Sequence, residues 1–194
     1  MTVPQIIFLV CVVVFTAVAA VFDARIKRLP NALTVPAFFA GILFTAVFGP
    51  LGSLLEGVGG RLLFSLGGFG VGFGILFVLW IIGGGGGGDV KFMGALGAWL
   101  GPIVTFEVLV VATAFSAIGS MAMMVREHIR LGPTRAKRRY ISRETLQAKH
   151  GKRALSAETR QQRMVRRRLM PFGVPAALAT WCVLAFVLCQ NLIK

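Results

Sequence analysis

Residues 3–22 read VPQIIFLVCVVVFTAVAAVF and contain no charged side chain. A helix of this length crosses the hydrocarbon core of a bilayer, which is about 30 Å thick and takes about 20 helical residues. No lysine or arginine precedes the stretch, whereas a cleaved signal peptide starts with a basic region. We therefore expect a retained membrane span.

The rest of the chain repeats this pattern. Only 14% of the 194 residues are charged and 56% are hydrophobic, whereas a soluble domain carries about 25% charged residues. Five further apolar stretches cover residues 32–51, 62–82, 92–100, 103–125 and 172–193. The fourth span, 92–100, is short and ends at a Gly-Pro pair. The sequence predicts one all-α, polytopic membrane domain over residues 1–194, with about six transmembrane helices.

The net charge of +14 is concentrated in one segment. Residues 126–170 hold fifteen of the 21 Lys and Arg side chains, but only three of the seven acidic ones. Since basic loops stay on the cytoplasmic side, we expect a long basic cytoplasmic loop there. Counting back through six spans places residues 23–31 and 83–91 on the same side. Arg25 and its basic neighbours in the first of these loops agree with that orientation.

The basic clusters at residues 137–139 and 166–168 suit anionic lipid headgroups, which contribute about 1 kcal/mol per basic residue near the surface. An enlarged cytoplasmic loop that binds nothing is the alternative. Tyr140 is the only aromatic residue of the segment, so we expect no nucleic acid. His128 and His150 stand alone there, and the three cysteines lie in apolar stretches. We expect neither a metal site nor a cofactor.

Two carboxylates stand at the predicted cytoplasmic ends of spans. Asp23 follows the first span and precedes a turn in which Pro30 favours an extended neighbour and Asn31 suits a helix N-cap. Asp89 follows six glycines, residues 83–88, which disfavour a helix and let a substrate strand approach closely. Each aspartate alone also fits an ordinary solvated loop residue. Together, two converging carboxylates can activate a water for peptide hydrolysis.

These residues resemble those of the type IV prepilin peptidases, which are membrane aspartic proteases. In that family an Ile/Leu-Pro-Asn turn follows the first aspartate, and the second closes a Gly-x-Gly-Asp motif before Val-Lys. The matching stretches here are Leu29-Pro30-Asn31 after Asp23, and Gly86-Gly87-Gly88-Asp89-Val90-Lys91. A late Leu-Pro-aromatic-Gly motif is similar to Met170-Pro171-Phe172-Gly173, with Met in place of Leu.

The resemblance implies that Asp23 and Asp89 form a catalytic dyad. It implies substrate-binding or supporting roles for Pro30, Asn31, Gly86, Gly88, Lys91, Pro171 and Gly173. The implied enzyme removes the basic leader of a prepilin at the cytoplasmic face of the bacterial inner membrane. The large members that also N-methylate the product carry paired Cys-x-x-Cys motifs, which this sequence lacks. The chain looks like the short, peptidase-only form of Flp/Tad pilus systems.

Two alternatives stay open. A presenilin-type protease also uses Gly-x-Gly-Asp, but the Leu-Pro-Asn turn is foreign to that group and six spans are too few. A non-enzymatic scaffold or small transporter subunit of a pilus or secretion system is the other. A transporter places polar groups near the midplane, whereas these spans are almost wholly apolar there. Glu107 is expected near the outer interface. The sequence leaves open the prepilin cut, the oligomeric state and the aspartate that holds the proton.

Overall fold

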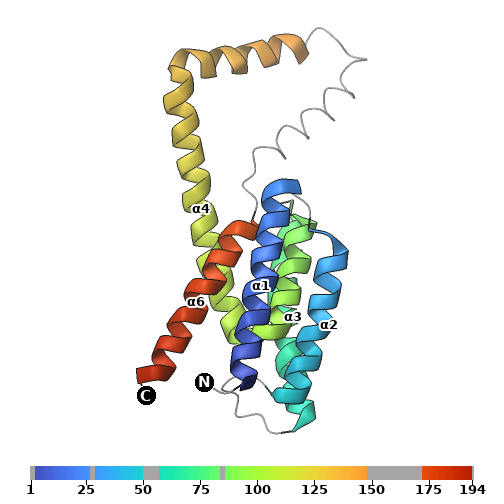
Figure 1. Ribbon diagram of the computed structural model, residues 1–194. Helices are drawn as coiled ribbons and strands as arrows, with labels where there is room; N and C mark the ends of the chain where they lie inside the picture. The colour runs from blue at the N-terminus through green and yellow to red at the C-terminus, as the bar shows by residue number, and fades with distance from the viewer. Residues whose placement is uncertain (1–2, 27–28, 50–56, 84–85, 148–171, 194) are drawn as a thin grey trace. The chain divides into compact units, whose positions relative to one another are not determined.

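The computed structural model describes residues 3–26, 29–49, 57–83, 86–147 and 172–193, and these residues form helices and short connections without a strand. The helices are α1 (Val3–Ile26), α2 (Asn31–Phe48), α3 (Val58–Ile81), α4 (Gly87–Gln147) and α6 (Gly173–Ile193) (Figure 1). Each contains a stretch long and apolar enough to cross a membrane. The predicted all-α membrane fold is confirmed.

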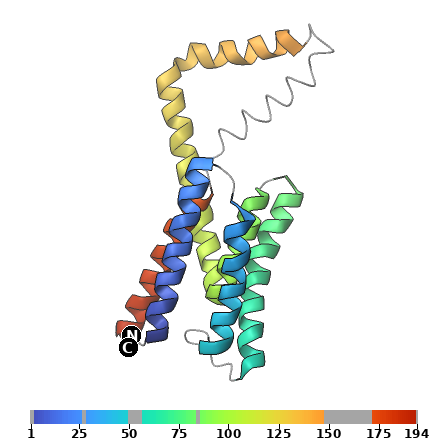
Figure 2. The same cartoon turned by 45° about the vertical axis from the view of Figure 1, so that its right-hand side comes forward.

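The chain divides into two units, residues 1–115 with 171–194, and residues 116–170. In the first unit α1 packs against α6 and α2, and α2 packs against α3. The ends of α1 and α3 and the starts of α2, α4 and α6 lie at the same end of this bundle (Figures 1 and 2). We call it the junction end, because every connection that carries a predicted site residue lies there.

The structure joins two of the predicted spans in one helical element. The sequence predicted separate spans at 92–100 and 103–125, but both belong to the single element α4, whose apolar part is Gly87–Met123. The described residues contain five helices that qualify as candidate spans, so the predicted count of about six is not confirmed. The Gly-Pro pair between the two stretches bends the helix instead of ending it.

The bend in α4 is sharp. Gly101 has a φ of 75°, which glycine adopts without steric strain, and Pro102 lacks a backbone N–H. A Cβ placed on Gly72 of α3 would be 2.8 Å from the carbonyl carbon of Met93 and 3.1 Å from Cγ2 of Thr105. In a straight helix those two residues would be about 18 Å apart. The chain therefore turns back at Gly101, and the two predicted spans are two arms of α4.

The first arm explains how so short a stretch lies within a membrane protein. All residues from 92 to 100 are buried, so other helices surround this arm. Three neighbouring helices hold it, through rings 5.5 Å apart in Phe15 and Phe92, through Ser65 Oγ–H donating to the Ala98 carbonyl at 2.8 Å, and through Trp99 Nε1–H donating to the Ala37 carbonyl at 2.8 Å. The stretch needs no full membrane length because protein covers it.

Glycines let α3 approach the first arm closely. A Cβ on Gly68 would lie 2.7 Å from Cα of Gly101, and a Cβ on Gly97 would lie 2.6 Å from the carbonyl carbon of Gly68. Gly68 thus faces Gly97 and Gly101, and Gly72, one turn further along α3, faces the backbone of Met93, one turn before Gly97. Small residues at this spacing bring membrane helices together, because burial of apolar side chains gives little drive for association in lipid.

The second unit continues α4 as a helix to Gln147. The first half of the predicted basic loop, up to residue 147, is therefore helical. The cluster at 166–168 and Pro171 lie outside the described residues.

We predict that Gly97→Ala destabilises the bundle. The added methyl group would press on the backbone of Gly68 and Phe69, and overpacking of this kind lowers stability by about 1–3 kcal/mol. Gly70→Ala is the matched control, because nothing lies within 4 Å of the added atom. Thermal unfolding in detergent micelles measures both. Equal midpoints for Gly97→Ala and wild type would contradict the packing described.

Candidate active site

Asp23 lies in the last turn of α1 rather than after the helix, because α1 continues to Ile26. Its side chain is only 6% exposed. Val12, Thr16 and Ala19 are buried on the same helix, and the spacing of three to four residues continues to Asp23. The carboxyl group thus extends the inward face of α1 at the junction end.

Gly173, the first residue of α6, supplies a donor to this carboxyl group. Its backbone N–H donates to Asp23 Oδ2 at 2.6 Å. The first N–H groups of a helix have no partner within the helix, so this one is available to a side chain. A Cβ on Gly173 would lie 2.8 Å from Asp23 Oδ2 and 2.9 Å from Asp23 Cβ. Only glycine leaves room for the carboxyl group where it stands.

Asp89 has a similar arrangement in the first turn of α4. The helix begins at Gly87, so the last two glycines of the run are helical. The Asp89 carboxyl group accepts a hydrogen bond from the backbone of Gly86, and a Cβ on Gly86 would lie 2.7 Å from Asp89 Oδ2. An acidic side chain in the first turn that bonds back to the residue before the helix is a known capping arrangement. Asp89 is half-buried.

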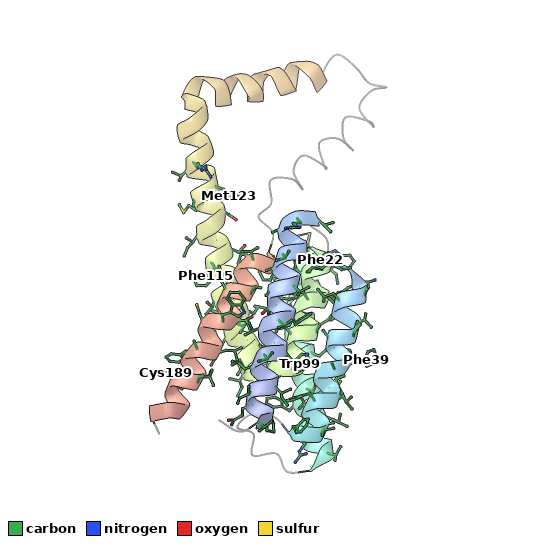
Figure 3. The ribbon with its side chains drawn as sticks, in the orientation of Figure 1. Phe22, Phe39, Trp99, Phe115, Met123 and Cys189 are labelled. Atoms are coloured by element: carbon green, nitrogen blue, oxygen red, sulfur yellow. The ribbon has the colours of Figure 1, made fainter. Side chains whose placement is uncertain are left out.

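The two carboxyl groups interact with each other. Asp23 comes from α1 and Asp89 from α4, and the two carboxyl groups lie close enough to interact electrostatically. Figure 3 shows Phe22, the neighbour of Asp23, at the junction end, with Trp99 nearer the opposite end of the bundle. The structure thus brings together the two carboxylates that the sequence singled out, each held by the backbone of a glycine.

The turn before α2 contacts the first turn of α4, which carries Asp89. Pro30 is the N-cap of α2, with an extended backbone (φ −70°, ψ 139°) and no side-chain capping bond. The expectation that Asn31 caps this helix is therefore wrong, because Asn31 is its first helical residue. Its Oδ1 instead accepts a hydrogen bond from Lys91 Nζ at 3.0 Å. Gly88 lies against the turn, with its Cβ position 3.7 Å from the backbone nitrogen of Leu29.

Two groups near these elements, Trp80 and Thr34, were not predicted from the sequence. Trp80 lies beside the start of α4, with Nε1 3.5 Å from the Cβ position of Gly87. Thr34, in the first turn of α2, is buried and its hydroxyl has no hydrogen-bond partner among the described residues. Glu107 is exposed. Within the described ranges, no three His, Cys, Asp or Glu side chains lie together as a metal site would need.

A comparison of the sequence with known protein families finds a match over the region that contains the two aspartates. Residues 8–123 match the type IV leader peptidase family, a range that contains both aspartates and the turn before α2. No curated protein and no solved structure gives a significant match to the chain. Since the matched range covers more than half of the sequence, the chain belongs to the type IV leader peptidase family.

Proposed function

We propose that this chain is an aspartic endopeptidase of the bacterial inner membrane that removes the basic leader from a type IV prepilin of the Flp/Tad kind. The observation that carries the proposal is the meeting of Asp23 and Asp89 at the junction end, in a member of the leader peptidase family. The sequence contains no Cys-x-x-Cys motif, which supports peptidase activity without N-methylation. The basic segment supports a cytoplasmic site.

The dyad suits hydrolysis because two carboxyl groups at one site divide the work of acid and base. One carboxylate takes a proton from water while the water oxygen forms a bond to the scissile carbonyl carbon. The other carboxyl group gives its proton to the carbonyl oxygen, which yields a tetrahedral diol. As the C–N bond breaks, the leaving nitrogen takes the proton that the first carboxyl group removed from water. The second carboxylate takes a proton from one hydroxyl of the diol, which restores the carbonyl and both members of the dyad.

The glycines around the dyad have two roles in this proposal: they orient the carboxyl groups and they leave room for the substrate. Backbone hydrogen bonds from Gly173 and Gly86 hold the carboxyl groups in orientation without a mobile side chain. The glycine run before Asp89 includes Gly83, whose φ is 89°, and it allows an extended substrate strand to approach the backbone. A prepilin would place its apolar helix in the bilayer and its cleavage site beside this run.

We predict that Asp23→Asn and Asp89→Asn each abolish cleavage, because an amide can act neither as the acid nor as the base. A loss of at least about 100-fold is expected. The measurement is the mobility shift of a co-expressed Flp-type prepilin, with Glu107→Gln as the control that removes an exposed carboxylate elsewhere on α4. Cleavage by either aspartate variant at the wild-type rate would refute the dyad. If the wild-type protein cuts none of a panel of prepilins, the result would favour the non-enzymatic scaffold.

A second prediction concerns Gly173. In Gly173→Ala the methyl group would lie 2.8 Å from Asp23 Oδ2, so the carboxyl group must move. Displacement of a reacting group by about 1 Å lowers a rate by up to about 100-fold. We expect a tenfold or greater fall in kcat with little change in KM. Gly74→Ala is the control, since nothing lies within 4 Å of its added atom. Normal kcat in Gly173→Ala would contradict this role.

For residues 126–170 we propose anionic lipid headgroups as the partner, on the strength of their fifteen basic side chains. Trypsin should cut this segment more slowly in nanodiscs that contain phosphatidylglycerol than in phosphatidylcholine alone. Salt at about 1 M shortens the screening length to about 3 Å and should remove the protection. Equal cleavage in both lipids would identify the segment as an unbound loop.

A further inference from the structure

Two contacts join the start of α4 to the turn before α2, and they flank Asp89. On one side Gly88 packs against the backbone of Leu29, and on the other Lys91 Nζ donates to Asn31 Oδ1 at 3.0 Å. Asp89 lies between Gly88 and Lys91 in the sequence. We call this pair of contacts the clasp.

We propose that the hydrogen bond between Asn31 and Lys91 positions Asp89 against Asp23, which makes Asn31 and Lys91 positioning residues of the dyad. The inference rests on the function proposed above. It assigns to these two residues a structural task inside the reaction, not contact with the substrate.

The first step of the argument is that α4 cannot set its own start. The residues before it are glycines, which have low helix propensity and wide backbone freedom. The position of this helix start must therefore be set by contacts between α4 and other elements. Val90 and Phe92 are buried at 3% and 0% exposure and anchor the inward face. Lys91 is exposed, and its bond to Asn31 ties the opposite face of the same turn.

The second step is that the dyad requires such a tie. Asp23 is on α1 and Asp89 is on α4, so the position of one carboxyl group relative to the other depends on how the start of α4 is held against α1. The turn that carries Asn31 follows α1 directly along the chain. The hydrogen bond from Lys91 Nζ to Asn31 ties the start of α4 to this turn, with the lysine two residues beyond Asp89.

The third step is that Asn31 has no competing task in helix formation. Pro30, not Asn31, is the N-cap of α2, and α2 has no side-chain capping bond. Substitution of Asn31 therefore leaves the helix start intact and removes the acceptor of the Lys91 ammonium. An exposed asparagine with no structural role would not need its Oδ1 to face the Lys91 ammonium.

A double-mutant cycle tests the inference with purified full-length protein and a prepilin in detergent micelles. We expect Asn31→Ala and Lys91→Met each to lower kcat by about three- to tenfold, as for loss of a hydrogen bond to a charged group at an exposed site. KM should stay near wild type. The double variant should be no slower than the slower single variant, and Lys91→Arg should retain most of the rate because it keeps a donor.

Controls separate this bond from charge and from folding. Arg25→Met removes an exposed basic residue from the last turn of α1 and should leave kcat within about twofold of wild type, a change below about 0.5 kcal/mol. All variants should share one thermal midpoint. A fall in kcat for Arg25→Met equal to that for Lys91→Met would show that net charge matters, and would overturn the inference.

The outcome also distinguishes the two proposals. If single effects multiply in the double variant, or if KM rises while kcat stays constant, Asn31 and Lys91 do not position the dyad. The function itself stands in that case, provided that Asp23→Asn and Asp89→Asn are inactive in the same assay. Cleavage by those two variants would instead remove the dyad and, with it, the basis of the clasp.

Discussion

The burial of Asp23 is the constraint on which the arrangement of this bundle depends. A carboxyl group inside an apolar helical bundle is unfavourable unless hydrogen-bond donors surround it. One such donor is the backbone of Gly173, so the first turn of α6 must begin against the last turn of α1. The long packing contact between these helices follows from that meeting, and Trp181 Nε1–H strengthens it lower down by donating to the Thr16 hydroxyl at 3.0 Å.

The first arm of α4 has the complementary task of presenting Asp89. The arm bends back at Gly101 before it reaches the length of a membrane span, and α1, α2 and α3 wrap it, so it is buried from residue 92 to residue 100. Close packing against α3 depends on glycines, and the indole of Trp99 meets Gly41 of α2 in the same manner, 2.7 Å from its Cβ position. Because cores packed to this density resist displacement, the arm gives Asp89 a rigid base despite the glycines before it.

Features that depend on residues close together in the sequence could be predicted from sequence patterns. Apolar runs located the helices, the basic segment predicts their orientation, and two aspartates at predicted helix ends indicated the candidate site. The bend at Gly101 was read as a break, because a Gly-Pro pair ends most helices and only the tertiary contacts of Gly72 show both arms together. The partner of Asn31 was likewise out of reach. Pattern alone favours Asn as an N-cap, whereas its Lys91 contact joins residues 60 positions apart.

The choice of backbone donors and a neutral amide also fits the chemistry proposed for the dyad. A lysine ammonium paired directly with one aspartate would favour its charged form at all times, yet each carboxyl group must gain and lose a proton during hydrolysis. Asn31 gives the Lys91 ammonium an uncharged acceptor, while Gly86 and Gly173 orient the carboxyl groups through peptide N–H groups. Orientation is thus separated from permanent charge. Basic residues stand close to both aspartates in the sequence, Arg25 after Asp23 and Lys91 after Asp89. Because no ammonium group is needed to orient the carboxyl groups, both can still exchange protons.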